Sequence, residues 1–281
     1  MAKFLSLETA LADNLRDGDR VAFEGFTHLI PHAAAHEAIR QGRKDLTLIR
    51  MTPDIVYDQM IGMGCARKLI FSFAGNPGVG LLRRLRDAVE NGWPAPIEIE
   101  EHSHAGLANG YEAGAAGLPS AVFRGYIGAE LKRVNPNIKS VTCPFTGEEL
   151  ACVPALRPDV GVIHAQKADK QGNVLIEGIV GAQKEAVLAS RRSVVTVEEI
   201  VEDFSDVHPN ACILPHWTVT AIAHVPGGAH PSYAHGYYPR DNATYLAWDA
   251  ISADRETFRA WMEENVIKAG PEAFAARVEG L

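Results

Sequence analysis

Cysteine is scarce in this sequence of 281 residues: the four that it contains, Cys65, Cys143, Cys152 and Cys212, are widely spaced. No two of them form a CxxC pair, and they make no tight cluster. Dispersed cysteines in a chain of this size are typical of a reducing compartment. We therefore expect a cytoplasmic protein.

Long apolar runs and concentrated positive charge are absent too. No apolar run approaches the ~20 residues of a membrane helix, and Met1–Ser6 is followed by Glu8, Asp13 and Arg16 rather than by the apolar core of a signal peptide. The formal net charge is −8, and lysine and arginine are spread along the chain. A nucleic-acid backbone or an anionic membrane surface needs a concentrated basic face, so we expect neither as a partner.

Hydrophobic residues make up 47% of the chain, which is enough for a large core in one α/β domain or two small ones. Short apolar runs alternate with amphipathic stretches. The predicted strands cover residues 21–23, 46–49, 69–73 and 97–100, and the predicted helices cover 5–15, 31–41, 55–63, 79–90 and 105–116. Strands that alternate with helices across short Gly/Pro loops indicate βαβ units, and so an α/β fold with an open, mainly parallel sheet flanked by helices.

The rest of the chain continues this pattern after one interruption. Arg133 to Pro158 is rich in proline and turn residues and predicts an irregular excursion over the sheet, and the alternation resumes at Asp159. The last segment, Asp241–Leu281, predicts helices anchored by large aromatic residues, namely Trp248, Phe258, Trp261 and Phe274. We find no repeat, linker or low-complexity segment, so we expect residues 1–281 to form a single domain.

One short stretch, Arg157–Val174, combines a strand with a group of polar residues. Val160–Ile163 predicts a buried parallel strand. His164, Gln166, Lys167 and Asp169 follow where that strand is expected to end, and Gly172-Asn173 turns the chain. Ligands of open α/β sheets bind beyond the carboxyl ends of strands. The alternative, a core strand followed by an ordinary surface turn, stays open.

Two glycine-containing loops also follow predicted strands. Gly75–Gly80 lies between a strand and a helix, where backbone amides and a helix N-terminus favour an anion, although it matches neither GxGxxG nor a Walker loop. Glu24–His28 follows the first strand, where Gly25 permits a sharp turn and Thr27 can donate a hydrogen bond. Each glycine has an alternative role in a tight turn or in packing. Because both loops follow parallel strands, we expect them at the same sheet edge.

Histidines supply the remaining candidates. Glu101–His104 follows the fourth strand, and Ser103 and His104 are expected to make polar contacts with a substrate there, unless His104 is only a structural hydrogen-bonding group. His32 and His36 are spaced by four, but no carboxylate or cysteine joins them at a recognisable ligand spacing, so we expect no metal. His230 and His235, near several tyrosines, are candidates for a binding or subunit surface.

Several motifs occur in the order of a known family. They are Glu24–Pro31, Phe71–Gly80, Glu101–His104, His164–Val174 and Val225–Ser232, with a helix that ends near Val194–Val201 after the fourth. Together they span essentially the whole chain and resemble the A subunits of two-subunit coenzyme A transferases. Within that family the sequence is similar to the glutaconate CoA-transferase branch, and there to the 3-oxoadipate CoA-transferases of aromatic-degrading bacteria.

The resemblance implies a CoA-transferase-like fold and transfer of CoA from succinyl-CoA to a dicarboxylic 3-oxoacid, 3-oxoadipate. CoA is then a substrate, and no resident cofactor is expected. The family attacks the thioester with a glutamate, which divides the transfer into two covalent steps. It carries that glutamate in a Ser-Glu-Asn-Gly-type motif of the B subunit. The nearest runs here, Glu24-Gly25 and Glu112-Ala113-Gly114, do not match it.

We therefore expect this chain to supply half of an active site, in a hetero-oligomer such as A2B2, and to contain no catalytic residue. Seven residues that follow predicted parallel strands are expected to bind the substrate: Phe26, Thr27, Ser72, Gly75, Asn76, Ser103 and His104.

Two alternatives remain. One is a glutaconate-type transferase or a CoA-ester hydrolase. In the ring-opening hydrolase branch an acidic residue falls where this chain has His104, which argues against that activity. The other is a ligand-sensing regulatory domain, although no DNA-binding helix pair or basic patch precedes the fold.

Overall fold

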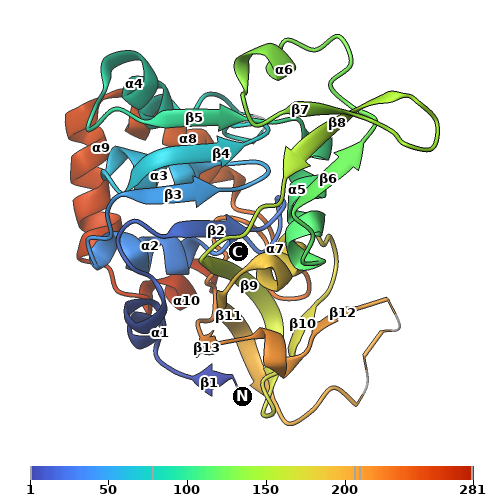
Figure 1. The fold of residues 1–281 in the computed structure, drawn as a ribbon. Helices are drawn as coiled ribbons and strands as arrows, with labels where there is room; N and C mark the ends of the chain where they lie inside the picture. Colours follow the sequence, from blue (N-terminus) through green and yellow to red (C-terminus); the bar gives the residue numbers. More distant parts are fainter. Residues whose placement is uncertain (1, 78, 206, 209, 280) are drawn as a thin grey trace.

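A computed structural model describes residues 2–77, 79–205, 207–208, 210–279 and 281 (Figure 1). Its main sheet has the strand order β1-β13-β11-β9-β2-β3-β4-β5, and neighbours along this path are parallel. These strands are β1 (Lys3–Phe4), β2 (Arg20–Glu24), β3 (Leu46–Ile49), β4 (Ala66–Phe71), β5 (Glu98–Glu101), β9 (Val160–Asp169), β11 (Arg192–Val201) and β13 (Ala221–His224). The predicted open, mainly parallel sheet is confirmed.

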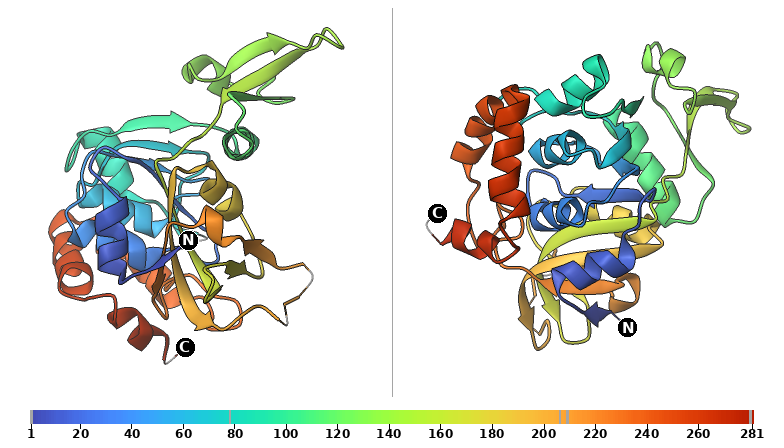
Figure 2. Two further views of the ribbon diagram at one scale, coloured as in Figure 1. Left: turned by 60° about the horizontal axis from the view of Figure 1, so that its bottom comes forward. Right: turned by 90° about the vertical axis from the view of Figure 1, so that its left-hand side faces the viewer.

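Helices cover both faces of this sheet (Figure 2). One face packs against α1 (Leu7–Asn14), α2 (His32–Arg40), α3 (Ile55–Gly62), α4 (Arg83–Asn91), α8 (Asn242–Ala253), α9 (Arg255–Met262) and α10 (Ala273–Val278). The other packs against α5 (His104–Ala115) and α7 (Gln183–Ala189). Along β2, Val21 and Phe23 enter the first core and Ala22 enters the second, as the two-residue period of a strand requires.

The helical C-terminal segment is confirmed, and Trp248, Phe258 and Phe274 are buried in its core. A π-helical segment, Glu263–Ile267, joins α9 to α10. Helix α4 begins at Arg83 rather than at Val79, because Gly80 has a φ of +149°, which no helix accommodates. None of the helices in the described part of the chain is long and apolar enough to span a bilayer.

Strand β9 is longer than predicted. It runs to Asp169 instead of ending near Ile163, because β11 pairs with it along its whole length, as far as Val201 opposite Asp169. Its last residues also pair with β10 (Val174–Ile176), which in turn pairs with β12 (Cys212–Leu214). Helix α7 ends at Ala189, and the Val194–Val201 segment belongs to β11. The predicted turn at Gly172 is present, with a φ of +91°.

The sequence predicted an irregular excursion at Arg133–Pro158, and this prediction is wrong. This segment holds β7 (Lys139–Thr142) and β8 (Glu149–Pro154), which form an antiparallel sheet with β6 (Ser120–Phe123), beside the short helix α6 (Leu131–Val134). A small core of Tyr126, Ile138, Ala151 and Val153 supports this sheet, which extends away from the main body in Figure 2. Pro136, Pro144 and Gly147 lie in the connections between regular strands, whereas Pro154 is the last residue of β8.

Candidate active site at the carboxyl edge

The carboxyl ends of β2, β3, β4 and β5 lie at one edge of the sheet, which we call the carboxyl edge. The strand register places Ala22 opposite Ile49, Ile49 opposite Ile70, and Phe71 opposite Glu101. The loops that follow therefore bring all seven predicted site residues to this edge, although contact of these residues with a substrate stays a prediction. Three inter-strand steps of about 4.8 Å separate the β2 loop from the β5 loop, so one ligand must span about 15 Å to meet both.

The loop after β2 is tightly folded. Gly25 is required for packing, because a Cβ there would lie 2.7 Å from the backbone oxygen of Leu29. Thr27 and Leu29 have positive φ values of 57° and 51°, a conformation that costs energy in residues other than glycine and occurs often at functional sites. Phe26 and Thr27 remain partly exposed.

His28 fixes this loop against two others. The backbone N–H of His235 donates to its Nε2 over 3.0 Å, so the proton is on Nδ1, which lies 3.2 Å from the carbonyl oxygen of Ile179. Burial lowers the pKa of His28 to about 4, and it is therefore a neutral imidazole near pH 7. The sequence offered His28 only as the last residue of the Glu24–His28 loop, whereas the structure gives it the role of joining three loops.

Behind the edge lies a buried pair of charged residues that the sequence analysis missed. Arg50 is 1% exposed; it donates to the Gly25 carbonyl oxygen over 2.8 Å and forms a 2.9 Å ion pair with Asp54. Glu24 accepts hydrogen bonds from the Met51 N–H and the Tyr111 hydroxyl. Burial raises the pKa of Glu24, and the Arg50 charge opposes that shift. The sequence could have indicated Arg50 as a residue of the edge, because it directly follows the predicted strand 46–49.

The loop after β4 is tied to its neighbour through backbone groups. The Ser72 hydroxyl donates to the Met51 carbonyl oxygen over 2.6 Å, and the Gly75 N–H donates to the Pro53 carbonyl oxygen over 3.1 Å. Asn76 is buried, and its side chain donates to the Tyr245 carbonyl oxygen of α8. Asn76 therefore holds the loop on the helical layer, while Ser72 and Gly75 stay partly exposed. Gly78 lies outside the described residues.

The loop after β5 starts helix α5. Ser103 caps that helix by accepting from the Gly106 N–H over 3.0 Å, and its own N–H donates to the Tyr126 hydroxyl. His104 is exposed at the first turn. The buried histidine of this motif is instead His102, whose ring contacts a carboxylate of β5, Glu100, at 3.0 Å. Burial opposes ionisation of Glu100, but hydrogen bonds from His102 and Lys68 hold its pKa at about 2.

The polar residues of β9 lie within the strand, not beyond its end as predicted, and they bond to other protein groups. His164 is fully buried and contacts Thr196 at 2.8 Å and Glu198 at 2.6 Å. Glu198 also accepts from the Tyr238 hydroxyl and the Gly227 N–H. Burial raises the pKa of Glu198, but the neighbouring His164 and these hydrogen bonds bring it below its usual range. We call these five residues the closed cluster.

Gln166 and Asp169 have structural partners as well. The Gln166 amide exchanges two hydrogen bonds with the backbone of Glu177, at 2.9 and 3.0 Å, and so fixes the loop that carries Ile179. Asp169 accepts from the backbone and side chain of Asn173 and closes the β9–β10 turn. Lys167 pairs with Glu199 at 3.5 Å. The alternative of a core strand with an ordinary turn therefore describes this stretch better.

The carboxyl edge carries apolar side chains that face solvent. Phe73 is 59% exposed, Ile179 49% and Val180 38%, and the loop that holds Ile179 contacts His28 of the β2 loop. Exposed apolar residues that gather beside a polar site are typical of a surface that another protein covers.

Neither of the glutamates considered as a nucleophile is arranged for attack. Glu24 is buried beneath the β2 loop and hydrogen-bonded, and Glu112 is exposed in the middle of α5. His32 and His36 have ring centroids 6.3 Å apart. Within the described ranges, no group of three or more His, Cys, Asp or Glu side chains has a metal-binding arrangement.

Comparisons with known proteins agree with this geometry. The family model described as coenzyme A transferase matches residues 4–224. The chain is 65% identical over 266 residues to the A subunit of a 3-oxoadipate CoA-transferase of Pseudomonas knackmussii, covering 95% of this chain and 94% of that protein. It is 31% identical to the A subunit of the glutaconate CoA-transferase of Acidaminococcus fermentans, covering 94% and 88%. The crystal structure of glutaconate coenzyme A-transferase from that organism matches with a TM-score of 0.90, covering 98% of this chain and 92% of that one.

Proposed function

Because this chain belongs to the coenzyme A transferase family, we propose that it is the A subunit of an enzyme that moves CoA from succinyl-CoA to 3-oxoadipate. The observation that carries the proposal is the high identity, sustained over nearly the whole chain, to a protein named as that subunit. The lower identity to the corresponding chain of a glutaconate CoA-transferase supports the same reaction type and gives less weight to glutaconate as the acceptor.

The partner, a B subunit, supplies the nucleophile. Its glutamate attacks the succinyl-CoA carbonyl, which expels CoA thiolate and leaves a mixed anhydride. The thiolate then attacks the glutamyl carbonyl of that anhydride, releasing succinate and leaving a glutamyl-CoA thioester. The carboxylate of 3-oxoadipate attacks this thioester, and the same two steps in reverse give 3-oxoadipyl-CoA and free glutamate. Each step exchanges one acyl bond for another, so no redox cofactor or metal is required.

This chain supplies the wall on which that chemistry takes place. Thr27 and Ser72, with the backbone around Gly75, offer polar groups to an anionic substrate, and His104 offers a side chain at the far end of the carboxyl edge. Ser103 and Asn76 position the loops, and Phe26 lies against the loop at Gly181. The exposed Phe73, Ile179 and Val180 support docking of the B subunit beside these residues, in an assembly such as A2B2.

The four cysteines are free, which supports a reducing compartment, and we place the enzyme in the cytoplasm.

The test is to purify the two subunits separately and assay each, then their mixture, with succinyl-CoA and a panel of acids that includes 3-oxoadipate, glutaconate and acetoacetate. We expect turnover only in the mixture, with the highest kcat/KM for 3-oxoadipate. Turnover by this chain alone would contradict the proposal of a shared active site. A preference for another acid would contradict the proposal that 3-oxoadipate is the acceptor. Release of free CoA without an acyl-CoA product would favour the hydrolase alternative.

A further inference from the structure

A cavity of about 300 Å³ lies within the helical layer that covers the sheet. Residues of α2, α3, α8, α9, the π-helical segment and α10 line it, and Figure 2 shows the C-terminal helices beside α2 and α3. None of the seven predicted site residues contributes to its wall. Its volume is at the lower end of the range for small-molecule sites.

The deepest part of the wall contains a histidine without hydrogen bonds. His32 is fully buried, and neither of its ring nitrogens has a partner among the described residues. Burial, together with the positive charge of nearby arginines, lowers its pKa well below the usual value, so the ring is neutral, with one donor and one acceptor. Its neighbour His36 is different, because its Nε2 contacts the Gln59 amide oxygen at 2.7 Å. A buried polar group left unpaired is costly, which indicates that an occupant of the cavity completes the bonding of His32.

A positive charge lies in the same wall. The guanidinium of Arg277 donates to the Asn265 carbonyl oxygen over 2.8 Å and stacks on Phe274 at 4.7 Å, and within the described ranges no carboxylate lies in ion-pair distance of it. The acidic residue of the wall, Asp241, is already engaged by His230 at 3.0 Å and by the Thr244 hydroxyl at 2.6 Å. Burial lowers the pKa of His230, so Asp241 keeps its negative charge, but its oxygens already accept hydrogen bonds from His230 and Thr244. Arg277 is the charged group of the wall that lacks an ion-pair partner among the described residues, and it can pair with an anion.

The rest of the wall is apolar, formed by Ile55, Ala247, Ile251 and Trp261. We propose that this cavity binds a small organic acid, whose carboxylate pairs with Arg277 and accepts from His32 while its hydrocarbon part packs against Ile251 and Trp261. Such a site shares no residue with the seven predicted for CoA transfer, and a molecule bound there stabilises the contact of the C-terminal helices with α2.

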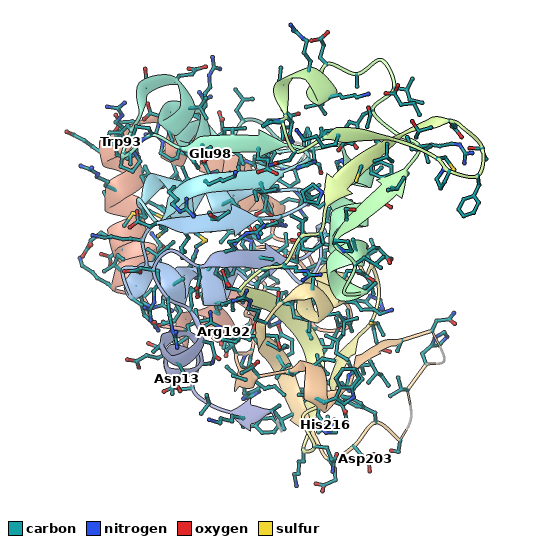
Figure 3. All side chains as sticks on the ribbon, in the orientation of Figure 1. Asp13, Trp93, Glu98, Arg192, Asp203 and His216 are labelled. Carbon is teal, nitrogen blue, oxygen red and sulfur yellow. The ribbon has the colours of Figure 1, made fainter. Side chains whose placement is uncertain are left out.

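Isothermal titration calorimetry of the assembled two-subunit enzyme tests the proposal, with benzoate and butyrate as probes and benzamide and butyramide as neutral analogues. We expect one acid molecule bound per copy of this chain and no measurable binding of either amide. Arg277→Gln removes the ion pair and is expected to weaken acid binding at least about tenfold. Arg259→Gln is the matched control, because Arg259 is exposed on α9 and stacks on Trp93 instead; Figure 3 labels Trp93.

A second variant keeps the test decisive if Arg277→Gln does not fold. Ala247 lines the cavity yet is exposed, so Ala247→Trp blocks the cavity without disturbing the core, and Ala250→Trp places the same side chain elsewhere on the exposed surface of α8. Loss of binding in Ala247→Trp but not in Ala250→Trp supports the proposal. It is overturned by acid binding that Ala247→Trp leaves unchanged, which places the acid at the carboxyl edge, or by no binding at about 10 mM acid.

Discussion

The carboxyl edge and the closed cluster both gather polar groups around strands of the same parallel sheet, yet they are built in opposite ways. At the edge, Thr27 and Ser72 stay partly exposed and Phe73 faces solvent. In the closed cluster, His164 is fully buried and Glu198 accepts three hydrogen bonds from protein groups. The difference teaches that a binding site is recognised by exposed polar groups that can still form hydrogen bonds. The number of polar residues alone does not identify it.

Two buried histidines, His164 in the sheet and His32 in the helical layer, repeat this contrast. His164 is paired through both ring nitrogens, whereas His32 is paired through neither within the described ranges. Both residues are fully buried, so burial alone does not separate a structural histidine from one that awaits a ligand.

The largest expected effect comes from opening the closed cluster. Glu198→Ala leaves three buried donors, on His164, Tyr238 and Gly227, without their acceptor, and each unsatisfied buried group costs about 1–3 kcal/mol of unfolding free energy. Glu199→Ala is the control, because this half-exposed neighbour contributes less than about 1 kcal/mol. Urea denaturation measures both. Similar losses in the two variants would mean that the cluster is not a structural unit.

Gly75→Val tests the open side of the comparison. Gly75 is not among the glycines with positive φ, so its backbone conformation is open to other residues. An added Cβ is crowded only by the ring of the exposed Phe73, at 3.1 Å, which can move, and it makes an ordinary contact of 3.8 Å with the Gly80 carbonyl oxygen. We expect a stability loss below about 1 kcal/mol and a transfer rate at least about tenfold lower in the assembled enzyme. An unchanged rate per folded molecule would make this loop a plain turn.

Two serines allow a smaller and more closely matched comparison. Ser72 donates to the Met51 carbonyl oxygen at the edge, and Ser252 makes a similar bond to the Trp248 carbonyl oxygen within α8. Replacing either with alanine is expected to cost about 1 kcal/mol of stability. Only Ser72→Ala is expected to lower the transfer rate, so equal rates in the two variants would count against a binding role for Ser72.

The effect expected to be smallest near pH 7 is a pH dependence at His28, which appears only on acidification. Burial lowers its pKa from the ordinary 6.5 to about 4, so the unfolded chain binds more protons than the folded chain between these values. Its contribution to stability is therefore complete above pH 6.5 and is lost as the pH falls to about 4. Melting curves of the wild type and of His28→Gln, recorded across this pH range, give the melting temperature as a function of pH. We expect this temperature to fall less steeply with decreasing pH in the variant. Equal pH dependence in both proteins would mean that His28 is not held neutral.

Much of the fold could be predicted from the sequence, because buried parallel strands such as Leu46–Ile49 are continuous apolar runs. The β6–β8 sheet could not be predicted, because its strands expose one face and are not continuous apolar runs. The proline and turn residues between them dominate the sequence pattern and indicate irregular structure. The extension of β9 was missed because His164 and Gln166 are unfavourable inside a strand until β11 and the Glu177 loop supply their partners.

The candidate site, like the fold, could be predicted only in part from the sequence. The rule that ligands bind at the carboxyl ends of strands places Thr27, Ser72 and His104 at one edge correctly. It does not reveal that the Asn76 side chain is buried against α8. Nor could spacing reveal the cavity at His32, because Arg277 comes from the opposite end of the chain.

The central claim is that CoA and the B subunit both bind at the carboxyl edge. Hydrogen–deuterium exchange of this chain, measured alone and then with CoA and the B subunit, tests it most directly. The account predicts new protection in the loops 25–31, 50–54, 72–77 and 178–181 and unchanged exchange at β9 and β11, whose amides are already paired. Protection confined to the β6–β8 sheet or to the C-terminal helices, with the edge loops unchanged, would contradict it.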